Sequence, residues 1–156
     1  MAVVLAEIGA NADRILPALG RIDAKAWVAK GASETYVAQL DSSLQQVRAA
    51  GDEAKSLSRN PEKLSAALQL LFRLEGIETM LGSLGEGARK YQSPQIAQAL
   101  AQVYAEGGAN RDRFRQYIVN LAAEREQQFE VMDREAQRCR ANLMAPTPPK
   151  STGRKK

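Results

Sequence analysis

The sequence predicts an all-α protein, and three observations support this class. Ala, Gln, Leu, Glu and Arg dominate the composition and favour helices, whereas aromatic residues make up only 5% of the chain. Apolar residues recur at spacings of three and four over long stretches, as on one face of a helix. Strand-like alternation of useful length and Asn-Gly or Asp-Gly hairpin turns do not occur. With 156 residues the chain is long enough for one domain with a hydrophobic core.

The expected architecture is an antiparallel up-and-down helical bundle over 1–143, with a disordered basic tail over 144–156. The bundle consists of three long helices plus an N-terminal helix, because the turns that join the long helices are short. The tail contains several prolines and no apolar run, so we do not expect it to join the core.

The N-terminal helix is predicted over about 2–21, with Pro17 inside it as a place where the helix kinks or divides. A short helical segment follows, with Asp23 as its N-cap and Gly31 as its C-terminal stop. Trp27 lies in this segment, and we expect its side chain to plug one end of the bundle. The apolar stripe of the N-terminal helix is Val4, Ile8, Ile15, Leu19 and Ile22.

The next two helices are predicted over about 33–58 and 61–90. Asn60 and Pro61 have the residue types of an N-cap and first helical position, so the second of these helices is expected to begin there. The apolar stripe is Val37, Leu40, Leu44, Val47, Ala54 and Leu57 in the former helix and Leu64, Leu68, Leu71, Leu74, Leu81 and Leu84 in the latter.

Ser93-Pro94 repeats the cap-and-proline pattern and begins a last helical stretch over 94–142. At 1.5 Å per residue this stretch is ~73 Å long if continuous, against ~45 Å for the helix before it. The residues beyond about 125 therefore have no partner on that helix, although their apolar pattern continues. The continuing apolar residues are Phe129, Met132, Ala136, Cys139 and Leu143.

Three arrangements would cover this overhang. The helix can kink at Gly107-Gly108, where helix propensity is lowest, with Asn110 capping a new start. The N-terminal helix can fold over it. A second chain can cover it, as a coiled-coil dimer seam or as a partner in a groove.

A carboxylate also falls on the predicted apolar stripe. On a 3.5-residue repeat Glu78 shares the seam of Leu64 and Leu71, and an unpaired charge there is costly. Counting from the turns places Ser43 and Tyr104 opposite it, which predicts a buried polar layer of these three residues. In the alternative, the helix is rotated slightly and Glu78 reaches solvent. Gly82 and Gly85 lie near the same seam and would allow close approach of another helix or of the Trp27 segment, unless the helix end is simply frayed.

The formal net charge of +4 belongs to the tail. Residues 144–156 contain four basic side chains and no acid, and without them 18 basic and 18 acidic residues remain. A neutral body makes nucleic acid an unlikely partner, since the tail alone supports only weak, non-specific contact with phosphates. The candidate polyanion contacts are Lys150, Arg154, Lys155 and Lys156.

The composition also excludes several chemistries. The chain has no His, which is the commonest general base and metal ligand, and a single Cys, which excludes an internal disulfide. We therefore expect no catalytic residues, no metal site and no cofactor. Apolar runs are too short for a transmembrane helix, and the first residues lack the basic region of a signal peptide. These features predict a cytoplasmic protein, or an exported one if the true start lies upstream with a signal peptide.

Two segments resemble parts of known proteins. WVAKGASETYV at 27–37 and EAQRCR at 135–140 are similar to segments of small helical proteins of acidobacterial soil bacteria. The resemblance covers the body 1–143 and implies a bacterial, all-helical protein, whose relatives often begin with an export signal. No activity is established for those proteins, so the resemblance assigns no functional residue.

The resulting functional hypothesis is a non-enzymatic helical-bundle protein that acts through protein–protein contact or self-association along its last helix. One alternative is an accessory protein that binds nucleic acid or an anionic membrane surface weakly through the basic tail. Another is small-molecule binding within the bundle, around Glu78 and Tyr104.

Overall fold

The computed structural model of the chain describes residues 1–149. Over this range it contains six α-helices and no β-strand, which confirms the predicted class. The four basic residues of the predicted polyanion contact lie outside the described range. The described residues divide into two compact units, Met1–Leu121 and a second that begins at Ala122, so the bundle is shorter than the predicted 1–143. The helices are α1 (Ala2–Gly20), α2 (Ala24–Ala29), α3 (Thr35–Leu57), α4 (Leu64–Tyr91), α5 (Pro94–Glu106) and α6 (Gly108–Met144).

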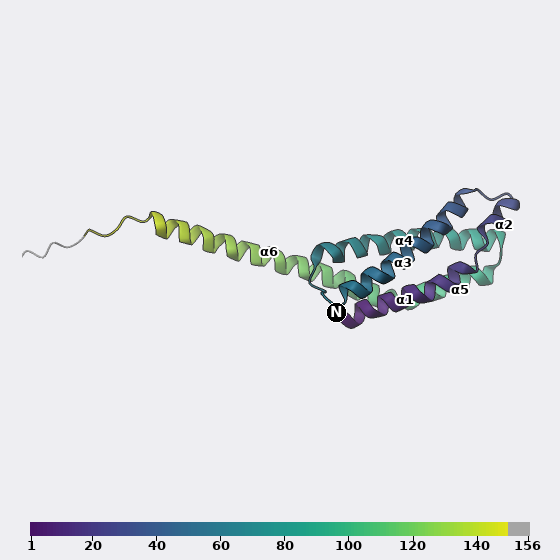
Figure 1. Cartoon of the computed structure of the whole chain (residues 1–156), viewed down its shortest axis with the longest axis horizontal. Helices are drawn as coiled ribbons and strands as arrows, with labels where there is room; N and C mark the ends of the chain where they lie inside the picture. Colours follow the sequence, from purple (N-terminus) through teal and green to yellow (C-terminus); the bar gives the residue numbers. More distant parts are fainter. Residues whose placement is uncertain (150–156) are drawn as a thin grey trace, which may run out of the picture. The chain divides into compact units, whose positions relative to one another are not determined.

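The first unit is an up-and-down bundle. Helix α1 packs on α3 and α5, and α4 packs on the same two helices, so the four form a closed ring. Neighbouring helices in this ring run in opposite directions (Figure 1). The N-terminal helix is thus a full member of the ring. It continues without division through Pro17, which is exposed and lies three residues before the helix ends.

The short helix α2 closes one end of the bundle, as predicted for the Trp27 segment. Asp23 caps α2 by accepting a hydrogen bond from the Ala26 amide at 3.1 Å, and Gly31 has the positive φ of a helix stop, at 99°. The Trp27 side chain is fully buried. Its indole N–H donates to Gln92 Oε1 at 2.9 Å, which ties α2 to the end of α4. Trp27 therefore both fills the end of the core and fixes the connection.

Gly87 provides the space for Trp27. A Cβ on Gly87 would lie 2.4 Å from the Trp27 ring, so only glycine fits here. The prediction that Gly82 and Gly85 allow this approach is wrong, since no neighbouring atom would lie within 4 Å of a Cβ at either position. The helix end is not frayed either, because α4 remains helical to Tyr91.

The turn between α3 and α4 differs from its prediction. Asn60 and Pro61 do not begin α4, which starts at Leu64. The Asn60 amide instead donates to the Leu57 carbonyl, and the Pro61 carbonyl accepts from the Tyr117 hydroxyl at 2.9 Å. This contact with α6 holds residues 58–63 as a turn.

The buried face of α4 is rotated relative to the predicted stripe. Leu74, Leu81 and Leu84 are buried as expected, whereas the other predicted leucines are only half-buried. Ile77 lies on the buried face, and Glu78, one residue further, is exposed. The buried side chains follow a regular three-four spacing: Ala67, Leu70, Leu74, Ile77, Leu81, Leu84 and Ala88.

The last helical stretch is interrupted at Gly107, where the sequence predicts a kink, but the break does not cover the overhang, since every residue of α6 from Ala123 onward is exposed. Ser93 caps α5 by accepting from the Gln95 amide, with Pro94 at the first helical position, as predicted. Helix α5 ends at Glu106, and α6 begins at Gly108. Asn110 lies inside α6 and is not the cap that the sequence suggested. The break divides the stretch that would otherwise be one helix into two.

Candidate functional site

A buried asparagine organises the break between α5 and α6. Asn11 lies on the inner face of α1 and is only 3% exposed. Its Nδ2 donates to the Val103 carbonyl at 2.8 Å, and its Oδ1 accepts from Arg111 Nη1 at 3.3 Å. The last carbonyls of a helix lack partners within the helix, and an interrupted helix adds such an end inside the bundle. Asn11 supplies a partner at this end.

Arg111 supplies a second partner. It comes from the first turn of α6, and its Nη2 donates to the Tyr104 carbonyl at 2.8 Å. The guanidinium also stacks on the Tyr104 ring, 3.7 Å from the ring centroid. Stacking and hydrogen bonding together hold α6 against the end of α5.

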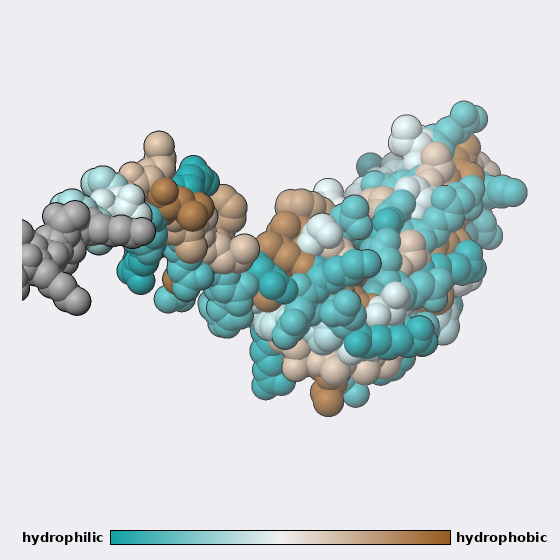
Figure 2. Space-filling view, turned by 60° about the vertical axis from the view of Figure 1, so that its left-hand side comes forward, coloured by the Kyte–Doolittle hydropathy of each residue, from teal (hydrophilic) through white to brown (hydrophobic). Residues whose placement is uncertain are grey.

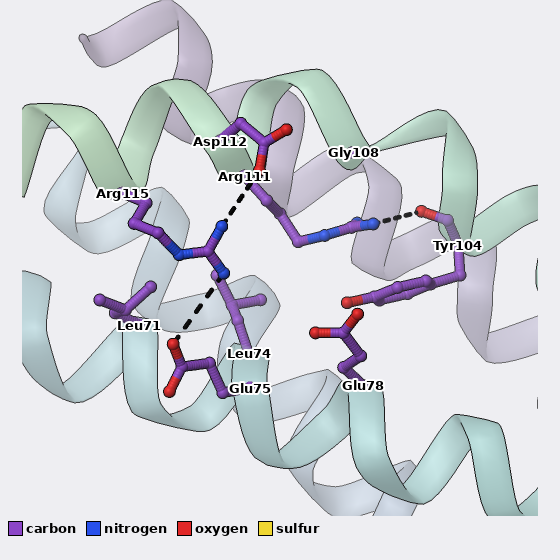
Figure 3. Close-up of a pocket in the computed structure, with 9 residues that line it drawn as sticks. All are labelled: Leu71, Leu74, Glu75, Glu78, Tyr104, Gly108, Arg111, Asp112 and Arg115. Carbon is purple, nitrogen blue, oxygen red and sulfur yellow. Dashed lines mark hydrogen bonds and ion pairs between the residues drawn. The ribbon is translucent and has the colours of Figure 1, made fainter.

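A small cavity of about 170 Å³ opens beside this contact, between α4 and the start of α6. Figure 3 shows Glu75 and Glu78 of α4 facing Tyr104, Arg111 and Arg115. Arg115 pairs with Asp112 at 3.0 Å and lies 3.9 Å from Glu75. The cavity walls are thus both acidic and basic. The cavity is lined by Leu71, Leu74, Glu75, Glu78, Tyr104, Gly108, Arg111, Asp112 and Arg115.

The predicted buried polar layer does not form. Ser43 is buried, but its hydroxyl donates to the Gln39 carbonyl of its own helix at 2.7 Å. Glu78 is exposed because the buried face of α4 passes through Ile77. Glu78 and Tyr104 do come together, with the carboxylate pointing toward the phenol hydroxyl (Figure 3). Only this pair of the three predicted residues shares a site.

The electrostatics of this pair act on Tyr104. Burial is the main cause that raises the pKa of Tyr104 above its usual value of 10.0; Arg111 lowers the pKa and Glu78 raises it. The phenol is therefore neutral at physiological pH. Drug-sized ligands generally occupy pockets of ~300–1,000 Å³, and this cavity is smaller. Its two arginines already bind protein groups, so the cluster serves mainly to fix the helix break.

The second unit contains the predicted partner face. Every residue of α6 from Ala123 onward is exposed. Phe129, Met132 and Leu143 are 73%, 67% and 86% exposed, and Figure 2 shows apolar side chains forming a patch bordered by hydrophilic ones on this unit. Ala136 and Cys139, the other two predicted residues of the face, are also exposed, and Cys139 is a free thiol.

The sequence did not predict that Asn11, Gly107 and Arg111 contact one another. A signal for Asn11 was present, because it lies three residues after Ile8 and four before Ile15, on the apolar stripe of α1. A polar residue on such a stripe needs a buried partner. Nothing local identifies that partner, since Val103 and Arg111 are 92 and 100 residues away in the chain.

None of the helices in residues 1–149 is long and apolar enough to cross a membrane. Comparisons with protein-family models, with curated proteins and with solved structures found no match to this chain.

Proposed function

We propose that this protein acts without catalysis, by binding a second copy of itself along the part of α6 that follows the bundle. The observation that carries the proposal is a helical stretch, from Ala123 to Met144, in which no side chain is buried. Helices gain most of their stability from packing one apolar face, and isolated helices are marginal in water. A partner that covers the apolar face supplies this missing packing.

The pattern of the exposed face fits a helical partner. Phe129, Met132, Ala136, Cys139 and Leu143 alternate spacings of three and four, which is the a/d pattern of a coiled coil. We call these five residues the seam. Single exposed apolar residues are common on proteins, but a row that keeps one register over two heptads is typical of an interface between helices.

The outer face of the same stretch is mostly polar, with Val131 as an exposed apolar exception, and two contacts pair side chains along it. Arg134 lies 3.8 Å from Glu130, and Gln137 donates to Asp133 at 3.0 Å. A helix with one apolar seam and a paired polar back has two distinct sides. This asymmetry favours a single partner helix on the seam over burial of the stretch on all sides.

The bundle supports a non-catalytic role. The chain contains no His, and the polar cluster of Asn11, Tyr104 and Arg111 makes hydrogen bonds that hold α5, α6 and α1 together. The bundle then serves as the folded body of each copy.

Two matched substitutions test the proposal in the full chain. Ala136→Glu introduces a carboxylate into the seam, whereas Ala141→Glu introduces the same side chain at an exposed position of the same helix outside the seam. Both change net charge and helix propensity equally. Because a dimer would bury an unpaired charge at position 136, we expect Ala136→Glu to weaken self-association at least about tenfold.

Sedimentation equilibrium measures this effect as a dissociation constant for each variant. The proposal requires Ala141→Glu to dimerise like the unchanged chain. Equal weakening by both substitutions would show that the seam is not the contact, and a chain that is monomeric before any substitution would refute self-association.

A further inference from the structure

We infer that the second copy lies parallel to the first and in register, so that each seam residue faces its own counterpart. This inference rests on the proposed self-association and adds its geometry. It comes from the length of seam kept in contact and from the charged residues that flank the seam. With Phe129, Ala136 and Leu143 at a positions and Met132 and Cys139 at d positions, Glu135 takes a g position and Arg140 the following e position.

In a parallel pair of helices, a g residue lies beside the e residue of the next heptad on the other helix. Glu135 of one copy therefore lies beside Arg140 of the second copy. The two-fold symmetry creates this pair twice. Gln128, the preceding g residue, would lie beside Asp133, which adds no like-charge contact. The flanking charges thus complement each other in the parallel arrangement.

An antiparallel arrangement that pairs a with d positions keeps at most four of the five seam residues against seam residues of the second copy. Placing Leu143 against Met132 puts Phe129 against Pro146, outside the seam, and placing Phe129 against Cys139 puts Leu143 against Arg125.

The register with Phe129 against Cys139 has its midpoint near residue 134. In antiparallel pairs g residues meet g residues and e residues meet e residues. Glu135 would meet Glu135 of the second copy, and Asp133 would meet its own counterpart. Two like-charge contacts at the centre disfavour this register. The register with Leu143 against Met132 places Asp133 beside Arg140, so it is disfavoured by the loss of Phe129 from the contact, whereas the parallel arrangement keeps all five seam residues.

Arg125 limits the parallel contact at its N-terminal end. It occupies the d position before Phe129, and its guanidinium donates to Gln128 at 3.4 Å. Facing arginines at this layer would repel each other if both were held in the seam. The close contact therefore begins at Phe129 and extends to Leu143.

Cys139 gives this geometry a direct readout. In the parallel register its thiol faces the thiol of the second copy across the seam. In the antiparallel register with Phe129 against Cys139 the two cysteines are separated by about ten residues of helix, or ~15 Å along the axis, but in the register with Leu143 against Met132 by only about three residues, or ~4.5 Å. Cross-linking therefore distinguishes the parallel arrangement from the former register. Charge exchange at Glu135 distinguishes it from the latter, in which Glu135 lies beside Asn142. Cys139 is the one cysteine of the chain, so any thiol cross-link between copies must join these two residues.

The experiment treats the full chain with a short bis-maleimide reagent, at a concentration where sedimentation gives the dimer mass. We expect most of the chain to become a covalent dimer. A matched control moves the thiol outward by combining Cys139→Ser with Ala141→Cys, and its cross-linked yield should fall at least about tenfold, since position 141 lies on the outer face.

Charge exchange provides an independent measurement. Glu135→Arg should weaken the dimer several-fold, and adding Arg140→Glu should restore it, because the double variant recreates the pair with reversed signs. A dimer mass without cross-linking at Cys139, or a dimer that Glu135→Arg does not weaken, would overturn the parallel register and leave self-association intact. A monomer mass at every concentration would instead overturn the self-association on which the inference rests.

Discussion

The side chain of Asn11 fills the space that a side chain at Gly107 would need. A Cβ on Gly107 would lie 2.4 Å from Asn11 Oδ1 and 2.7 Å from Asn11 Cγ. The backbone of Gly107 has φ −86°, which any residue can adopt. Glycine is required here by the close approach of α1 and not by backbone conformation. The buried asparagine and the glycine at the helix break thus depend on each other.

Gly107→Ala should destabilise the bundle by about 2 kcal/mol, because the added methyl group overlaps a buried, hydrogen-bonded side chain. The matched control is Gly108→Ala, since a Cβ there has only one neighbouring atom within 4 Å, on Arg111 at 3.9 Å. Its effect should stay within about 0.5 kcal/mol. Urea unfolding followed by circular dichroism measures both. Similar losses for the two variants would mean that helix propensity, and not the Asn11 contact, determines the cost.

Asn11→Ala should destabilise the chain by about 1–3 kcal/mol, because it leaves the Val103 carbonyl without its side-chain donor. In the Asn11→Ala background, Gly107→Ala should cost less than alone, since the overlapping Asn11 atoms are gone and the remaining close atom, Arg111 Nη1 at 2.6 Å, is the end of a flexible side chain. A double-mutant cycle of unfolding free energies reports this coupling. Additive effects would disprove the contact.

Gly87→Ala should displace Trp27 from the end of the core. A Cβ at this position would lie 2.4 Å from the indole and 3.0 Å from the Tyr36 ring, so we expect a loss of about 2 kcal/mol and a red shift of tryptophan fluorescence. Gly85→Ala, in the same helix and with open space around it, should stabilise by about 0.5–1 kcal/mol. An unshifted emission in Gly87→Ala would contradict the plug formed by Trp27.

Arg73 joins α4 to α3 through a two-pronged contact with Glu53, at 2.9 Å from Nε and 2.8 Å from Nη2. Lysine keeps the charge but cannot make both bonds, so Arg73→Lys should destabilise by about 1 kcal/mol in thermal or urea unfolding. Arg89→Lys is the comparison, because Arg89 makes an exposed pair with Glu86 within one helix. That change should cost less than about 0.5 kcal/mol. Equal losses for the two variants would show that the paired hydrogen bonds from Arg73 to Glu53 contribute no extra stability.

Titration of Tyr104 should occur above pH 10.0, because burial, and more weakly Glu78, raises its pKa. The stabilisation that this shift provides is fully present below the unfolded pKa and is lost as the pH rises through the folded pKa. The difference in ultraviolet absorbance between the unchanged chain and Tyr104→Phe isolates this group. Glu78→Gln should move the titration to lower pH, and a shift to higher pH would contradict the arrangement in Figure 3.

Local patterns predicted the helices well where a short-range contact determines the structure. Ser93 and Asp23 cap their helices as expected, because both caps are bonds within three residues. The similar Asn60-Pro61 pair failed, because the Pro61 carbonyl accepts from Tyr117, which is 56 residues away. A long-range hydrogen bond of this kind leaves no mark on the local sequence.

The candidate site shows the same limit. The apolar face of α4 is wide enough that two stripes fit the spacing rule, and only packing against α3 and α5 selects the one through Ile77. The choice turns Glu78 outward and removes the predicted polar layer. The break at Gly107 was expected from helix propensity, but the reason for it is the approach of Asn11 from α1. Side-chain volume between distant helices is not visible in a one-dimensional pattern.

The molar mass of the full chain in solution tests the central proposal most directly. Light scattering coupled to size-exclusion chromatography, repeated over a range of loading concentrations, reports it independently of shape. The account predicts a mass that rises toward twice the 17.0 kDa of one chain, and that begins to rise for Ala136→Glu only at concentrations at least about tenfold higher. A mass of 17.0 kDa for the unchanged chain at every concentration would contradict it.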